Sequence, residues 1–160
     1  LDKTGCLPQL PPPTDEEFYV RKPEESRFLG CCNEFFWSLC DTAKGIYRDE
    51  LPFAMTTYHM LAHNMLEVML GWYIGSRTGF SVSCGKLNKY FKNYLPEEFY
   101  LLYTQTFTDS SYDHFWQAIK NSCRLFHESA ILTAEALGFT YPQSYEEGFM
   151  KYMEFLRSQR

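Results

Sequence analysis

Residues 111–137 read SYDHFWQAIKNSCRLFHESAILTAEAL, and this stretch decides the fold class of the chain. Apolar and small residues recur in it at spacings of three and four, which places them along one stripe of an α-helix. The stripe consists of Phe115, Ile119, Ser122, Phe126, Ala130, Thr133 and Leu137. We expect Ser110 and Asp113 to form a variant of the capping box at its start and Gly138 to end it. The stretch therefore predicts one long amphipathic helix.

Helical patterns continue on both sides of this stretch. The further expected helices are residues 23–48, about 52 to 75 or 79, 86–95, 96–107 and 144–157. The second of them carries a stripe made of Met55, Tyr58, Leu61, Met65, Val68 or Met69, and Trp72. Ser144 and Glu147 form a second capping box, at the start of the last helix. Helices of this length joined by short connections predict an all-α fold, an antiparallel helical bundle of about five to six helices.

The N-terminal residues have a different composition. Prolines crowd residues 8–13, where they remove backbone donors and favour extended geometry, so residues 1–22 are predicted to form a linker or an extended Pro-rich arm. A short helical turn after Thr14 is the alternative for the acidic end of this arm. Residues 1–5 read like the end of a strand and a turn. We therefore expect the chain to continue a longer protein, with residues 23–160 as its helical domain.

The composition limits the class of protein. A formal net charge of −5 argues against extensive nucleic-acid binding, which normally requires a basic surface. No apolar stretch approaches the roughly 20 residues of a membrane-spanning helix, so no membrane insertion is expected. The six cysteines form no CxxC pair, which favours reduced thiols in a cytoplasmic protein. The aromatic share of 18% indicates either a ring-rich core or rings that line a ligand groove.

Basic residues at two helix ends form a candidate nucleotide site. Lys44 and Arg48 stand four residues apart at the end of the first long helix, and Lys86 follows Gly85 at the start of another. If the bundle brings these ends together, Lys44 and Lys86 could hold a polyphosphate between them. The alternative is ordinary solvation of two helix ends.

The densest polar and aromatic segment, CCNEFFW at residues 31–37, is a candidate substrate site. Asn33, Glu34 and Trp37 share or border one helical face, and they combine an amide, a carboxylate and a large ring. That mixture suits a polyhydroxylated cation. The alternative is a surface acid beside a core aromatic ring.

A third candidate concerns metal binding. His59, His63 and Glu67 are spaced four residues apart, so they could project from one helical face as ligands. A helical metal site usually draws its ligands from two or more helices, and we therefore expect a solvated polar face here and no metal.

Several segments of the sequence together resemble the aminoglycoside 6-adenylyltransferase family, the streptomycin-modifying nucleotidyltransferases. The matching pieces are PTD at residues 13–15, YVRKP at 19–23, CCNEF at 31–35, KG at 44–45 with Arg48 and Glu50, FSVS at 80–83, GK at 85–86, KY at 89–90, LGF at 137–139 and YP at 141–142. They occur in order over most of the chain, which makes the match more specific than any single motif.

This resemblance implies that the chain is the C-terminal domain of a two-domain enzyme, which transfers AMP from ATP to a hydroxyl of streptomycin or a similar aminoglycoside. An N-terminal nucleotidyltransferase domain would hold Mg²⁺ on its aspartates. Here Asn33, Glu34 and Trp37 would contact the drug, and Lys44, Arg48 and Lys86 the nucleotide.

One position departs from the family pattern. The family often has an acidic residue at the position of Thr56, which cannot act as a base at neutral pH, so Glu34 is the acidic candidate for catalysis. A non-catalytic helical module that binds another polar ligand is the alternative function.

Overall fold

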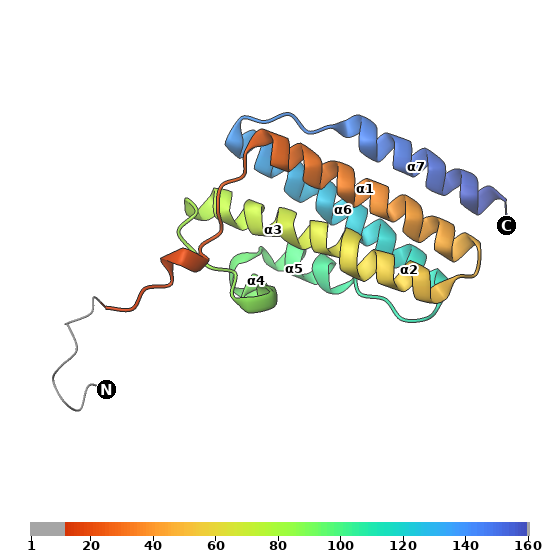
Figure 1. Ribbon diagram of the computed structural model, residues 1–160, viewed down its shortest axis with the longest axis horizontal. Coiled ribbons are helices and arrows are strands. Elements are labelled where there is room, and N and C mark those ends of the chain that lie inside the picture. The colour runs from red at the N-terminus through yellow and green to blue at the C-terminus, as the bar shows by residue number, and fades with distance from the viewer. Residues whose placement is uncertain (1–11, 160) are drawn as a thin grey trace, which may run out of the picture.

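The computed structural model describes residues 12–159, and these form the all-α fold that the sequence predicts (Figure 1). The helices are α1 (Glu25–Tyr47), α2 (Leu51–Thr57), α3 (His63–Thr78), α4 (Phe91–Tyr94), α5 (Glu97–Thr104), α6 (Tyr112–Leu137) and α7 (Gln143–Ser158), with a π-helical turn η2 (Tyr58–Ala62) and two short 3₁₀ turns, η1 (Glu16–Phe18) and η3 (Lys86–Asn88). Because α2, η2 and α3 follow one another without a break, they form one continuous helical rod. The described residues thus contain six helical units, as expected.

Sequential long helices are antiparallel, whereas α3 and α6 run in the same direction (Figure 1). A tight turn after α1 reverses the chain into the rod, and another reversal joins α6 to α7. After α3 the chain runs back through α4, α5 and the following connection to the end of the bundle at which α2 begins. There α6 starts. The bundle is therefore antiparallel between α1 and the rod and between α6 and α7, while two packed pairs, α3 with α6 and α1 with α7, are parallel (Figure 1).

The turn between α1 and α2 depends on a glycine. A Cβ on Gly45 would stand 2.9 Å from the side chains of Ala54 and Phe53, which is closer than real Cβ atoms approach. Asp49 takes a left-handed φ of 61°, and the Glu50 backbone N–H donates to the Gly45 carbonyl at 2.8 Å. The absence of a side chain at Gly45 thus lets the two helices cross closely.

Aromatic rings fill the core. Phe35 of α1 and Phe126 of α6 are both fully buried and stack with their centroids 3.9 Å apart. Phe36 meets Phe126 edge-on and also contacts Phe149 of α7. These rings join α1, α6 and α7, as expected of a ring-rich core.

The π turn changes which face of the rod is buried. The expected stripe included Leu61, yet Leu61 is 45% exposed, and Ala62 and Leu66 are fully buried in its place. A π turn adds one residue to the helical repeat, so the faces before and after it are offset. Of the predicted stripe, Tyr58, Met69 and Trp72 are buried, Met55, Met65 and Val68 are partly buried against the core, and only Leu61 is exposed.

The single basic helix expected over residues 86–95 is absent. In its place are η3, within which Leu87 and Asn88 both have left-handed backbone conformations, and the separate helix α4. Gly85, with a φ of 73°, precedes them, and a Cβ there would meet the Tyr90 ring at 2.6 Å. The chain thus folds tightly over itself between residues 83 and 90.

The expected capping boxes do not form. Ser111 precedes α6 without a side-chain capping bond, and Asp109 accepts the Ser111 backbone N–H and the His114 ring instead. Pro142 precedes α7, which begins one residue before the predicted Ser144 position. The expected turn after Thr14 does form as η1, and its first N–H donates to the Thr14 hydroxyl at 3.2 Å.

Several other predictions concern the chain as a whole. The extended Pro-rich arm falls largely on residues 1–11, outside the described residues. Within the described residues the cysteines are free thiols, and burial raises the pKa of Cys32 to about 12. No helix in the part that the structure describes is long and apolar enough to cross a membrane.

Candidate functional site

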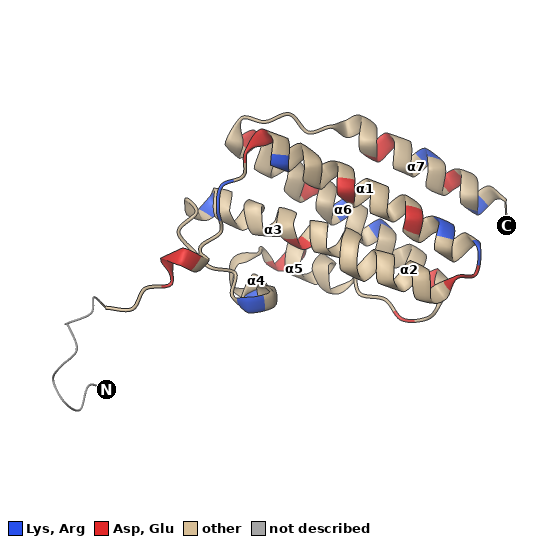
Figure 2. Ribbon diagram, in the orientation of Figure 1, with Lys and Arg blue, Asp and Glu red and all other residues tan. Residues whose placement is uncertain are grey.

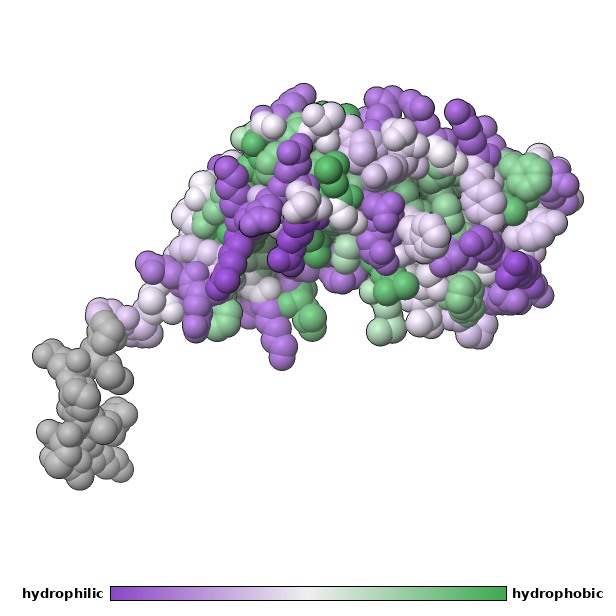
Figure 3. Space-filling model, turned by 45° about the horizontal axis from the view of Figure 1, so that its top comes forward, coloured by the Kyte–Doolittle hydropathy of each residue, from purple (hydrophilic) through white to green (hydrophobic). Residues whose placement is uncertain are grey.

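A pocket of about 750 Å³ opens at the end of the bundle where the N-terminal segment joins α1. It lies between residues 18–27, the middle of α3 and residues 83–88. Its lining comprises Phe18, Tyr19, Val20, Arg21, Lys22, Pro23, Glu24, Arg27, Asn64, Glu67, Val68, Gly71, Trp72, Ser83, Cys84, Gly85 and Asn88. Figure 3 shows hydrophilic side chains gathered at this end of the molecule.

The N-terminal segment supplies a cationic wall. Arg21, Lys22 and Arg27 line the pocket and are exposed, and none of them has an ion-pair partner among residues 12–159. Figure 2 shows basic residues in the chain between η1 and α1. The segment is fixed to the bundle because the Val20 backbone N–H donates to the Val82 carbonyl at 3.0 Å. This wall can therefore present positive charge to an anionic ligand.

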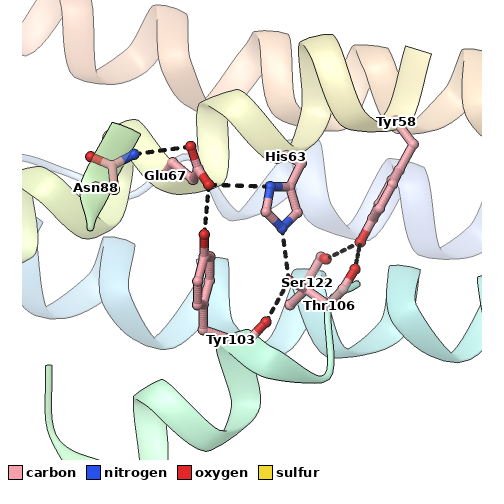
Figure 4. A network of polar contacts seen from close by, with 7 residues as sticks. All are labelled: Tyr58, His63, Glu67, Asn88, Tyr103, Thr106 and Ser122. Carbon is pink, nitrogen blue, oxygen red and sulfur yellow. Dashed lines mark hydrogen bonds and ion pairs between the residues drawn. The ribbon is translucent and has the colours of Figure 1, made fainter. Parts of the chain in front are cut away.

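The opposite wall carries a carboxylate. Glu67 projects from α3 with 24% of its side chain exposed. The Tyr103 hydroxyl donates to its Oε1 at 2.6 Å, and the Asn88 amide donates to its Oε2 at 2.9 Å (Figure 4). One donor from α5 and one from η3 thus hold the two carboxylate oxygens in place.

Behind Glu67 a chain of hydrogen bonds continues into the core (Figure 4). The Thr106 hydroxyl lies 2.7 Å from the Tyr103 carbonyl and 2.8 Å from the His63 Nε2, and it can hydrogen-bond to both. The Tyr58 hydroxyl donates to the Thr106 carbonyl at 2.6 Å and also bonds to Ser122. The π turn lies between Tyr58 and His63, and it sets the direction from which each ring enters this network.

His63 lies between two polar partners. Its Nε2 shares a hydrogen bond with the Thr106 hydroxyl, and its Nδ1 lies 3.6 Å from the Glu67 Oε1. Burial lowers the pKa of His63, the Glu67 charge partly offsets this shift, and His59 adds to it. Burial, together with the bond to Glu67, raises the pKa of Tyr103 far above its usual value, so its hydroxyl keeps its proton.

The three predicted drug-binding side chains lie on α1 outside the pocket lining, and two of them are exposed. Asn33 is exposed, Trp37 is 65% exposed, and Glu34 is half-buried and accepts a hydrogen bond from Ser38 at 3.3 Å. Trp37 is therefore not a core ring. Helical spacing places all three on or beside one face of α1, as the sequence predicts.

The predicted nucleotide residues are split between two places. Lys44 forms an ion pair with Asp41 at 2.8 Å in the last turn of α1, and the exposed Arg48 follows it. Lys86 follows the pocket residue Gly85 in sequence but does not itself line the pocket. Arg27 at the pocket and Lys44 are separated by roughly 25 Å of helix. Figure 2 shows the basic end of α1 far from α4, so the structure does not bring Lys44 and Lys86 together.

Two of the three side chains considered as metal ligands have other hydrogen-bond partners. His63 and Glu67 are held by Thr106, Tyr103 and Asn88, as described above, and His59 is half-buried. Across residues 12–159 no group of three or more His, Cys, Asp or Glu side chains is arranged to hold a metal ion.

Most of the pocket was not apparent from the sequence. The YVRKP motif contains Arg21 and Lys22, but no pattern indicated that these residues face α3. The sequence indicates Glu67 only as part of a polar helical face. Asn88 reaches Glu67 only because the backbone around it is left-handed, which a predicted regular helix excluded.

Comparison with known proteins identifies the family of this chain. The sequence profile described as "Streptomycin adenylyltransferase" matches residues 1–156. The chain belongs to the streptomycin adenylyltransferase family. This result confirms the resemblance drawn from the sequence motifs.

Individual members of the streptomycin adenylyltransferase family show the same relation. An aminoglycoside 6-adenylyltransferase of Campylobacter jejuni is 34% identical over 153 residues, which make up 96% of this chain and 53% of that protein. The corresponding proteins of Staphylococcus aureus and Bacillus subtilis are 32% and 30% identical, again over 96% of this chain and 54% of each relative. The chain spans about half the length of the curated relatives it matches.

A solved structure shares the fold as well. The crystal structure of an aminoglycoside 6-adenyltransferase from Bacillus subtilis superposes with a TM-score of 0.79 at 29% identity, covering 92% of this chain and 56% of that one. The helical bundle is therefore a fold found within the streptomycin adenylyltransferase family.

Proposed function

We propose that this chain is the helical, substrate-binding part of an aminoglycoside adenylyltransferase and that its pocket is one side of the cleft for ATP and the drug. The observation that carries this proposal is the pocket, where three unpaired cations face a fixed carboxylate in a member of the streptomycin adenylyltransferase family. The reaction joins a polyanionic nucleotide to a cationic drug. A pocket with walls of opposite charge suits that pair of substrates.

The cationic wall is proposed to bind the phosphates of ATP. Arg21 and Arg27 offer planar guanidinium groups that can form paired hydrogen bonds to phosphate oxygens, and Lys22 and Lys86 add point charges. Lys44 and Arg48 lie at the far end of α1, so they would act on the nucleotide only through a surface that another part of the protein completes.

The drug is proposed to contact the exposed face of α1 through Asn33, Glu34 and Trp37. A carboxylate pairs with guanidinium, an amide bonds to hydroxyl groups, and an exposed indole ring attracts cations. These residues provide the aminoglycoside with the contacts expected for a polyhydroxylated cation.

In the proposed reaction a hydroxyl oxygen of the drug attacks the α-phosphorus of ATP. The new bond joins this oxygen to phosphorus, the bond from the α-phosphorus to the bridging oxygen breaks, and pyrophosphate leaves with the electron pair. The hydroxyl proton passes to a base, for which Glu34 is our candidate on this chain. The chain's part is to hold the two substrates in line with each other.

The family also implies Mg²⁺. The residues described here do not fit such a site, because the pocket lining contains only two carboxylates, Glu24 on one wall and Glu67 on the other. We therefore propose that the metal is held by an N-terminal nucleotidyltransferase domain, and no step on this chain depends on it.

The proposal is tested by measuring transfer of radiolabelled AMP from ATP to streptomycin. The protein that carries this chain together with a nucleotidyltransferase domain is expected to form adenylylated streptomycin, and the 160-residue chain alone is expected to release no pyrophosphate. Pyrophosphate release by the pure chain would contradict the division of roles. Binding of streptomycin without any transfer by the longer protein would favour the non-catalytic module.

A further inference from the structure

Glu67 is the acidic side chain that the pocket holds most firmly. Its two oxygens accept hydrogen bonds from Tyr103 and Asn88, which belong to different segments, so the carboxylate cannot turn freely. A carboxylate offers about four acceptor positions, and these two bonds occupy only half of them. The rest of this partly exposed group lies in the pocket lining and remains able to accept from a ligand.

No cation of the described residues neutralises Glu67. Arg21, Lys22 and Arg27 lie on the pocket lining as well, but none comes within ion-pair distance of it. The nearest basic group is His63, whose Nδ1 lies 3.6 Å from the Glu67 Oε1 and whose buried ring favours the neutral form. The negative charge is therefore available to a positively charged ligand.

The surface beside Glu67 leaves room for the body of such a ligand. Gly71 lies one helical turn further along α3 and also lines the pocket, and a Cβ placed there would meet nothing within 4 Å. Trp72 follows it in the lining. A ligand that places a cation on Glu67 can thus lie along α3 over Gly71 without displacing a side chain.

We propose that Glu67 binds a guanidinium or ammonium group of the aminoglycoside and that Tyr103 and Asn88 are positioning residues for this carboxylate. This inference rests on the proposed function, and it adds a drug-binding residue in the pocket to the face of α1. A carboxylate already fixed by two donors loses little freedom when it binds, which strengthens a charged hydrogen bond.

The first test is nuclear magnetic resonance of the 160-residue chain with labelled glutamate carboxyl groups, titrated with streptomycin at low ionic strength. The Glu67 resonance is expected to move with the added drug, whereas that of Glu154 on α7, which is exposed, is expected to stay in place. If other pocket resonances shift while that of Glu67 does not, the role of Glu67 is overturned and the proposed function is not. No response of any pocket signal at millimolar streptomycin overturns the proposed function as well.

The second test compares Glu67→Gln with the control Glu154→Gln by titration of streptomycin and of ATP. Loss of the charge is expected to weaken streptomycin binding by about 10- to 100-fold and to change ATP binding by less than about twofold. The control is expected to behave as the unsubstituted chain does. Equal streptomycin affinities for the two variants would overturn the proposal, and the carboxyl resonance decides the matter if Glu67→Gln does not fold.

The positioning role has its own readout. Tyr103→Phe and Asn88→Ala each remove one donor that fixes Glu67, so the streptomycin-induced shift of the Glu67 carboxyl resonance is expected to become smaller in both variants. A purely structural role would lower the melting temperature and leave that shift unchanged. An unchanged shift in both variants would overturn the assignment of these two residues.

Discussion

Glu34 and Glu67 are both carboxylates on helices of the bundle, but their surroundings differ. Glu34 accepts one hydrogen bond, from Ser38 of the next turn, on an outer face of α1. Glu67 is held from two segments inside a pocket. The two acids therefore represent two separate places at which a cationic drug can contact this chain.

Replacing Glu34 by Gln keeps the shape of the side chain and removes its charge. In the protein with both domains, we predict a loss of roughly 1.5–3 kcal/mol in streptomycin binding with little change for ATP. If Glu34 also accepts the hydroxyl proton, turnover falls by a further 10²- to 10⁴-fold, on the order expected for a lost general base. Calorimetry and steady-state kinetics measure both effects, and wild-type values for each would make Glu34 an ordinary surface acid.

The buried imidazole of His63 gives the fold a dependence on pH. Burial lowers the pKa of His63 in the folded chain below its unfolded value of about 6.5. The unfolded chain therefore takes up the proton first as the pH falls. We predict that the free energy of unfolding is fully present above about pH 6.5 and declines below it, until the pH reaches the folded pKa.

Urea unfolding between about pH 8 and about pH 5 measures this decline. His63→Gln is expected to flatten the curve in that window, after allowance for His59, whose pKa burial also lowers. The exposed His114 acts in the opposite sense, because its hydrogen bond to Asp109 raises its pKa. His114→Gln is therefore the matched control, and a curve flattened by it rather than by His63→Gln would contradict the prediction.

At the scale of elements, the last turns of α3 hold the N-terminal segment. A Cβ on Gly75 would come within 2.6 Å of the Phe80 ring and 3.0 Å of the Val20 side chain. We predict that Gly75→Ala destabilises the chain by about 1–3 kcal/mol through overpacking, less the gain of up to ~1 kcal/mol in helix propensity. It is also expected to loosen the segment that carries Arg21 and Lys22.

Gly148 of α7 provides the control, because a Cβ there would meet nothing within 4 Å. Gly148→Ala is expected to stabilise the chain by roughly 0.5–1 kcal/mol. Chemical denaturation of both variants gives the two signs, and limited proteolysis reports the loosening near Val20. Stabilisation by both substitutions would show that the Phe80 ring moves aside at no cost.

How far the sequence predicted these elements depended on regular spacing. The stripe of α6 and the positions of α1 and α5 follow from it, because apolar periodicity and helix ends are local properties. The π turn and the left-handed pair Leu87 and Asn88 could not be predicted in this way. They are stabilised by tertiary contacts, such as the bond from Asn88 to Glu67. The pocket, which needs both irregular features, was missed for the same reason.

At the scale of the whole molecule, the length of α1 separates the two groups of predicted nucleotide residues. Lys44 lies in the last turn of α1 and pairs with Asp41, whereas Lys86 lies in η3, next to the pocket residue Gly85 at the other end of the bundle. In the protein with both domains, we predict that Lys44→Ala and Lys86→Ala each weaken ATP binding. Their effects on the binding free energy are expected to add within about 0.5 kcal/mol, as they do for distant sites.

Equilibrium titration of ATP into both single variants and the double variant measures this additivity. Thermal stability is expected to change little in all three, because exposed charges contribute little to folding. Wild-type affinity in Lys44→Ala would leave Lys44 as a solvated helix end paired with Asp41. Strong coupling between the two lysines would contradict the separation seen in the structure.

The π turn at Tyr58–Ala62 affects how the chain tolerates the loss of a residue during evolution. A π turn takes up one extra residue while the helix on either side keeps its orientation, so loss of a single codon within it would restore a regular α-helix and leave Glu67 facing the pocket. The same loss within α2 would instead rotate every later residue of the rod by about 100°. A one-residue gap in an alignment at the π turn is therefore compatible with an unchanged binding surface, whereas a gap in α2 is not.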